Sequence, residues 1–140
     1  MSETTPYTGG CLCGALRYEA TGEPRYAGLC YCADCRKATG SGFAPFLGFP
    51  SAQVRVAGPP PLVSRNRAAN GNEAVRNSCP VCGGLVFGGI LGTEGVLNIY
   101  AGSLDDPSQF RPTVAIFTES KPDWVLIPPS ITRTFPRMPG

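Results

Sequence analysis

Cysteines are the residues of this chain best suited to chemistry, because it contains seven of them and no histidine. They fall into three short groups, namely Cys11 with Cys13, then Cys30, Cys32 and Cys35, then Cys79 with Cys82. Disulfide frameworks usually close long loops between distant partners, and a bridge between cysteines one residue apart is strained. The grouping therefore favours metal binding over disulfide bonds.

Two of these groups have the spacing of a four-thiolate zinc site. Zinc prefers four sulfur ligands at about 2.3 Å in a tetrahedron, and a CxC or CxxC turn can direct two of them at one ion. Pro80 can stiffen the second turn, while Gly83 and Gly84 permit positive φ and bring backbone N–H groups close to the sulfurs. We expect a closed structural zinc site formed by Cys11, Cys13, Cys79 and Cys82.

The middle group would leave one position on a zinc ion open. Three sulfurs can hold the ion, and the vacant position is then available to a substrate or a water molecule. We therefore expect two zinc ions per chain, the second of them catalytic and bound by Cys30, Cys32 and Cys35.

Three other interpretations of the cysteines remain open on spacing. An iron–sulfur cubane would take a fourth ligand from another group and leave three cysteines unused. A redox pair is possible at Cys32 and Cys35 or at Cys79 and Cys82, although neither pair lies in the alternating strand and helix pattern of thioredoxin-like motifs. A single structural zinc with three free thiols also fits the spacing.

Composition predicts one packed globular domain over residues 1–140. Hydrophobic residues make up 42% of the chain and charged residues 16%, which is not the balance of a disordered chain. The net charge of +2 is scattered without a basic run, so nucleic acid is not an expected partner. No apolar run approaches the roughly 18 residues that a membrane span needs, and no signal segment begins the sequence. We expect a cytoplasmic protein whose thiols stay reduced.

Short segments rich in β-branched and aromatic residues, separated by glycine and proline, predict a mainly β fold. The expected strands lie within residues 15–21, 43–49, 52–58, 84–91, 95–102, 113–120 and 123–129. Short helices are expected only within residues 32–40, 66–75 and 103–110.

Taken together, five segments resemble the glutathione-dependent formaldehyde-activating, or GFA/CENP-V, domain family. They are GGCLCGALRYEA, CYCADCRKATGSGF, CPVCGGLVF, AGSLDDP and IFTESKPDW, and they span nearly the whole chain. The resemblance implies a zinc-stabilised, β-sandwich-like single domain (Mss4-like) with few short helices. It also implies the same division of the cysteines into four structural and three catalytic ligands.

The reaction for which that family is named joins glutathione to formaldehyde and gives S-(hydroxymethyl)glutathione. Glutathione is a small thiol and formaldehyde a small aldehyde. The enzyme class of this reaction is carbon–sulfur lyase. Zinc would bind the thiol as thiolate or polarise the aldehyde oxygen. Arg36 and Lys37 directly follow the last cysteine of the triplet and could meet the carboxylates of glutathione. The alternative is a zinc-stabilised binding domain without catalysis.

One position departs from the family pattern. Family members commonly carry a histidine in the segment that corresponds to TVAIF, where this chain has Ala115. Acid and base steps would therefore fall to water, a carboxylate or the bound thiolate itself.

Overall fold

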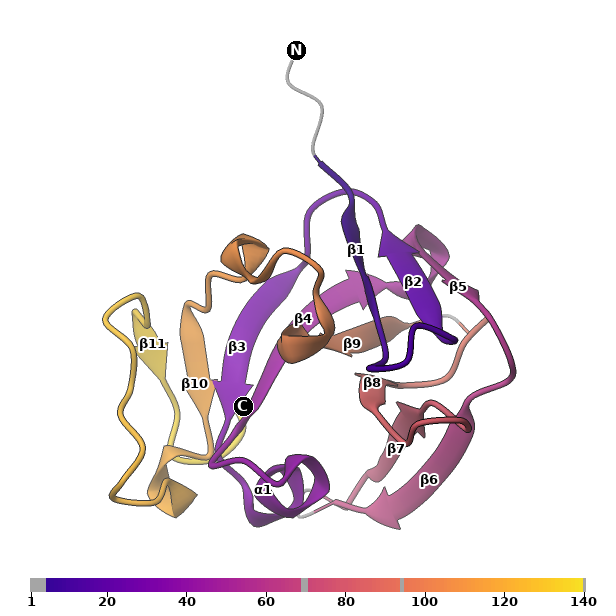
Figure 1. Ribbon diagram of the computed structural model, residues 1–140. Helices are drawn as coiled ribbons and strands as arrows, with labels where there is room; N and C mark the ends of the chain where they lie inside the picture. The colour runs from indigo at the N-terminus through magenta and orange to yellow at the C-terminus, as the bar shows by residue number, and fades with distance from the viewer. Residues whose placement is uncertain (1–4, 69–70, 94, 140) are drawn as a thin grey trace.

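Two β-sheets form the framework of the computed structural model, which describes residues 5–68, 71–93 and 95–139 (Figure 1). The smaller sheet is antiparallel and has the order β1-β2-β5, with β1 at Tyr7–Gly10, β2 at Arg17–Ala20 and β5 at Val54–Ala57. The expected mainly β fold class is thus confirmed.

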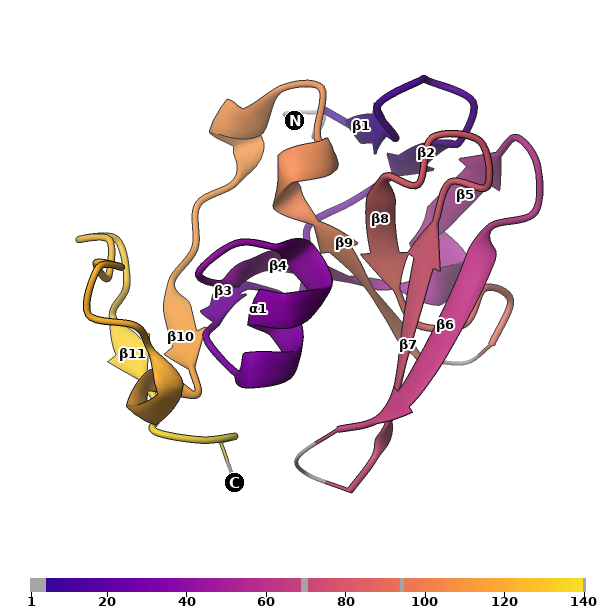
Figure 2. The ribbon, with the colours of Figure 1, turned by 60° about the horizontal axis from the view of Figure 1, so that its bottom comes forward.

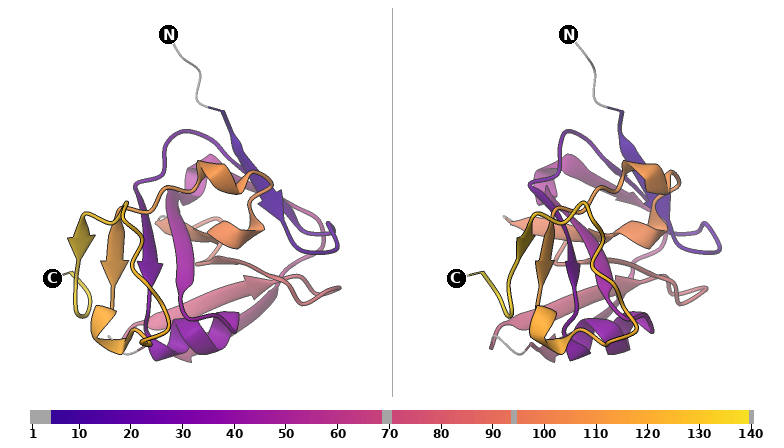
Figure 3. Two further views of the ribbon diagram at one scale, coloured as in Figure 1. Left: turned by 60° about the vertical axis from the view of Figure 1, so that its left-hand side comes forward. Right: turned by 90° about the vertical axis from the view of Figure 1, so that its left-hand side faces the viewer.

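The larger sheet has eight strands in the order β11-β10-β3-β4-β9-β8-β7-β6. Its strands in chain order are β3 Tyr26–Cys30, β4 Ala44–Pro50, β6 Leu62–Arg67, β7 Glu73–Ser78, β8 Leu85–Gly88, β9 Val96–Tyr100, β10 Val114–Ile116 and β11 Arg133–Thr134. Pairing is parallel from β11 through β10 to β3 and antiparallel in the rest. Figure 3 shows the resulting twist, with β3, β4 and β10 upright and β6 and β7 lying across them.

Alternation along the central strands gives the larger sheet two different faces, because successive side chains of a strand point to opposite sides. Leu47 of β4 pairs with Ile99 of β9, and both are buried in the main core beside Tyr18 of the smaller sheet. Phe46 pairs with Tyr100 and points to the other side. One face therefore belongs to the core, while the other is free to form a site.

A second, smaller apolar cluster lies at the β10 side of the larger sheet. It consists of Leu29, Tyr31, Ala115 and Val125, with three half-buried neighbours packed against it. The Tyr31 hydroxyl is buried there, and no residue in the described part of the chain forms a hydrogen bond with it.

The helical segments are short. The α-helix α1 spans Ala33–Thr39 and ends at Gly40, whose φ of 71° is the left-handed conformation that favours glycine. Figure 2 shows α1 in front of β4, between β10 and β7. Four 3₁₀ turns complete the described elements: η1 Ser51–Gln53, η2 Ala101–Ser103, η3 Pro107–Gln109 and η4 Thr118–Ser120. Among the described residues, no helix combines the length and apolar character of a membrane crossing.

Most expected strands are present, and the short helix expected within residues 103–110 is present as the 3₁₀ turn η3, but two local predictions need correction. Residues 66–75 were expected to be helical, yet their described part belongs to the hairpin of β6 and β7; residues 69–70 lie outside the described chain. Pairing across this hairpin outweighed the local propensity. Residues 123–129 were expected to form a strand but contain none.

Asn77 is a buried polar residue of β7 that bonds to the backbone at and after β8. Its Nδ2 donates to the carbonyl oxygens of Phe87 at 3.2 Å and Gly89 at 2.8 Å, where the register of β7 against β8 shifts. Asn77→Ala should lower the free energy of unfolding by about 2–3 kcal/mol, because two buried carbonyl groups lose their donor. Urea denaturation measures the change.

The exposed Thr93, which donates to the Ile90 carbonyl at 2.8 Å, offers the matched control. Thr93→Ala should alter stability by under about 0.5 kcal/mol. Equal effects of the two substitutions would contradict the role given to Asn77.

Candidate metal centres

Four cysteines from two distant turns meet at one point. The sulfurs of Cys11, Cys13, Cys79 and Cys82 all lie within 4.8 Å of one another, and each residue is a free thiol. The sulfur of Cys13 is 3.6 Å from that of Cys11 and 3.8 Å from that of Cys79. Two sulfurs on one tetrahedral zinc, each at about 2.3 Å, are about 3.8 Å apart. The donor set and its spacing therefore fit zinc.

Backbone N–H groups stabilise negative charge on these sulfurs. The turn after β1 places the N–H of Leu16 3.3 Å from the sulfur of Cys11, and this contact contributes most to lowering the Cys11 pKa to about 6. In the turn between β7 and β8, the N–H of Gly84 points at the sulfur of Cys82 and lowers its pKa. Gly83 has a φ of 77°, as the sequence led us to expect for this turn. Such N–H to sulfur contacts are typical of thiolate metal ligands.

The other three cysteines also converge. Cys30 ends β3, Cys32 caps α1 and Cys35 lies in the first turn of α1. Their sulfurs lie within 4.8 Å of one another. The Cys32 sulfur accepts hydrogen bonds from the other two thiols and from the Cys35 N–H at 3.2 Å, which lowers the Cys32 pKa to about 2. One sulfur is thus prepared for ionisation, as metal binding requires.

A cavity of about 550 Å³, which we call the larger cavity, opens beside this three-cysteine group. Cys30 and Cys35 form part of its wall, together with Asn98 and Tyr100 of the free sheet face. Further lining residues are Arg25, Tyr26, Ala44, Phe46, Thr113, Val114, Ile116, Arg133, Phe135, Met138 and Pro139. Arginines are the charged residues among the described lining residues, so this cavity is suited to an anionic ligand.

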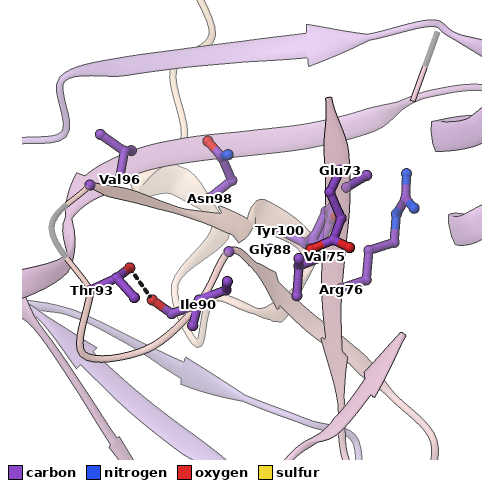
Figure 4. A pocket seen from close by; sticks show the side chains of 12 residues that line it. Glu73, Val75, Arg76, Gly88, Ile90, Thr93, Val96, Asn98 and Tyr100 are labelled. Atoms are coloured by element: carbon purple, nitrogen blue, oxygen red, sulfur yellow. Dashed lines mark hydrogen bonds between the residues drawn. The ribbon is translucent and has the colours of Figure 1, made fainter. Parts of the chain in front are cut away.

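A smaller cavity of about 390 Å³, drawn in Figure 4, is lined by residues that include members of β7, β8 and β9. Glu73 and Arg76 of β7 lie at this cavity, and Asn98 and Tyr100 of β9 line both cavities. The two cavities are therefore neighbours that share two residues of β9.

Arg76 is a functional candidate that our sequence analysis did not identify. Its guanidinium lies beside the sulfur of Cys35 and the hydroxyl of Tyr100; burial opposes its charge, yet these two groups raise its pKa. Its Nη1 donates to Asn66 Oδ1 at 2.6 Å, while its Nε is buried without a hydrogen-bond partner among the described residues. Nothing in the local sequence of β7 marks this arginine, because it reaches the triplet only through the fold.

Two basic residues suggested by the sequence lie elsewhere. Arg36 is half-buried and Lys37 exposed, both on α1, and neither is among the described residues that line the two cavities. Arg25 and Arg133, which carry no recognisable signal in the sequence, occupy the wall of the larger cavity instead. Asn98 and Tyr100 could have been found, because the alternation in GVLNIYAG places them opposite the buried Leu97 and Ile99.

Ala115 does not face the cavity. It is fully buried in the second apolar cluster, whereas its neighbours Val114 and Ile116 line the larger cavity. Asp105 is also remote from this lining, because it pairs with Arg17 at the smaller sheet, which lowers the Asp105 pKa to about 2. Neither position supplies an acid or a base to the three-cysteine group.

The fold and the sites define a β-rich domain with two cysteine groups that could each hold a metal ion. The chain belongs to a family whose model is described as glutathione-dependent formaldehyde-activating enzyme, which matches residues 6–120. A crystal structure of a Rhodobacter sphaeroides protein has the same fold at 19% sequence identity, with a TM-score of 0.53, covering 73% of this chain and 93% of that one. No curated protein matches the chain.

Serine substitutions should separate the two metal sites. The wild-type protein should carry close to two zinc ions. Cys79→Ser should abolish stable folding, because its site joins turns 66 positions apart and a structural zinc contributes about 10 kcal/mol or more to folding. Cys32→Ser should remain folded with one zinc, because its ligands lie in one short loop. Thermal melts and zinc counts measure both effects.

The same pair of variants can contradict this division. If Cys32→Ser unfolds as completely as Cys79→Ser, the three-cysteine group is structural. If wild-type protein binds iron with visible absorbance instead of zinc, the sites hold a different cofactor.

Proposed function

We propose that this chain is a zinc-dependent enzyme of the carbon–sulfur lyase type. It joins glutathione to formaldehyde to give S-(hydroxymethyl)glutathione and also catalyses the reverse reaction. One observation carries the proposal: the three-cysteine group, one ligand short of a tetrahedron, forms part of the wall of a cavity of about 550 Å³. Cavities of this size hold small ligands in many proteins, and the family match supports the choice of reaction.

Cys30, Cys32 and Cys35 would hold the catalytic ion. When bound, zinc supplies a Lewis acid that keeps an incoming thiol ionised and polarises an aldehyde oxygen. The negative charge of three thiolates exceeds the positive charge of Zn²⁺, which weakens the binding of a further anionic ligand. Arg76, beside Cys35, offsets that negative charge and so favours a fourth sulfur at the centre.

The larger cavity can also hold the rest of the thiol. Glutathione has two carboxylates, and Arg25 and Arg133 present two guanidinium groups at the cavity wall. Tyr26 donates to Asn98 Oδ1 at 2.7 Å, which leaves the amide N–H groups of Asn98 to meet a peptide carbonyl. These contacts would hold the thiol and the aldehyde together, and such positioning is a large part of catalysis in additions of this kind.

Activity should depend on the three-cysteine group. Zinc-loaded wild-type protein should consume formaldehyde in the presence of glutathione faster than the spontaneous addition, and Cys32→Ser should not. Glutathione should also change the visible spectrum of the cobalt-substituted protein, because its sulfur would join the coordination sphere. A spectrum unaffected by glutathione and by other small thiols would favour the alternative, a binding domain without catalysis.

Arg133 provides a separate test of glutathione recognition. It lies at the cavity wall with its guanidinium 5.2 Å from the Phe135 ring centroid. Arg133→Met should raise the KM for glutathione about 10-fold with little change in kcat, because a contact to a remote carboxylate stabilises ground state and transition state equally. Arg111→Met, an exposed position outside the lining, is the matched control and should leave KM unchanged.

A further inference from the structure

Tyr100 lies where the reaction needs a hydrogen-bond donor. It lines the larger cavity together with Cys30 and Cys35, on the sheet face opposite the core. The described lining of this cavity includes no histidine, aspartate or glutamate. An aldehyde oxygen that gains negative charge there needs a hydrogen-bond donor from another residue type.

The hydrogen bonding of Tyr100 leaves its proton available. Arg76 lies near Tyr100, since both residues line the smaller cavity, and a guanidinium can only donate hydrogen bonds, so Arg76 does not accept the phenolic proton. Within the described chain, no protein acceptor takes the Tyr100 O–H. Tyr26 differs, because its O–H is already donated to Asn98.

The environment keeps that proton in place. A phenol is protonated at neutral pH, and burial raises the Tyr100 pKa further. The positive charge of Arg76 nearby also polarises the phenol, which strengthens the O–H as a hydrogen-bond donor. The hydroxyl also lies close to Gly88 of β8, because a Cβ added at that position would be 3.5 Å from it.

We propose that Tyr100 is a catalytic residue of this site, whose O–H donates to the aldehyde oxygen during carbon–sulfur bond formation, and that Arg76 positions it. The thiolate sulfur forms a bond to the carbonyl carbon as the C=O π bond breaks, and that electron pair moves to the oxygen held by Tyr100. Water finally supplies the proton of the product hydroxyl, which balances the proton lost by the thiol. This inference rests on the proposed function and adds a residue to it.

Tyr100→Phe removes the donor and retains the ring. It should lower kcat above the spontaneous rate about 100-fold, in the forward and the reverse direction alike, because one oxyanion donor contributes factors of 10²–10³. The variant should retain two zinc ions, the wild-type melting temperature and the glutathione-induced change in the cobalt spectrum. Tyr7→Phe is the matched control, because Tyr7 lies in the main core, outside both cavity linings and away from the three-cysteine group; its kcat should stay within about 2-fold of wild type.

Three results would overturn the inference. If Tyr100→Phe has the kcat of the wild-type protein, this inference is wrong and the proposed function is unaffected. Loss of zinc or of the glutathione-induced spectral change in Tyr100→Phe would assign Tyr100 a structural role. No acceleration by the wild-type protein would remove the proposed function and this inference with it, so the two failures are distinguishable.

Discussion

The pleat of the larger sheet is the constraint on which both the core and the cavities depend. Successive residues of β4 and β9 must point to opposite faces. Leu47 and Ile99 therefore reach the core, while Phe46 and Tyr100 reach the larger cavity. A slip of one residue in the register would exchange the two sets and place a phenol and an amide in the apolar core. Stability of the fold and geometry of the cavity wall are consequently specified by the same pairing.

The two cysteine groups use the chain in different ways. The four-cysteine group joins the turn after β1 to the turn between β7 and β8, so it connects the smaller sheet to the larger one. Loop closure over so long a segment constrains the chain strongly. The three-cysteine group is local to the end of β3 and the start of α1, where one sulfur caps the helix. A local group adds little constraint, but it faces a cavity.

Charge is the second requirement of the three-cysteine group. Sulfur anions brought together repel one another, and a partly buried position weakens the screening by water. Arg76 on β7 supplies a positive charge from the opposite part of the same sheet. The strong twist of the sheet brings β7 toward α1, as Figure 2 shows. The same arginine lies near Tyr100 in the lining of the smaller cavity, so the sulfur group and the cavity wall share one cation.

Much of this protein follows from its sequence alone. Cysteine spacing determined the two groups of possible metal ligands, because short turns fix which sulfurs can point together. Period-two patterns predicted half of the strands of the larger sheet, namely β4, β8, β9 and β10. The 66–75 hairpin was missed because its residues favour a helix locally and form strands only through the pairing of β6 with β7. Only the tertiary structure decided that Arg25 and Arg133, and not Arg36 and Lys37, line the larger cavity, and that Arg76 lies beside Cys35. These arginines come from strands and loops far apart in the chain, and no local pattern encodes where a twisted sheet brings such residues together.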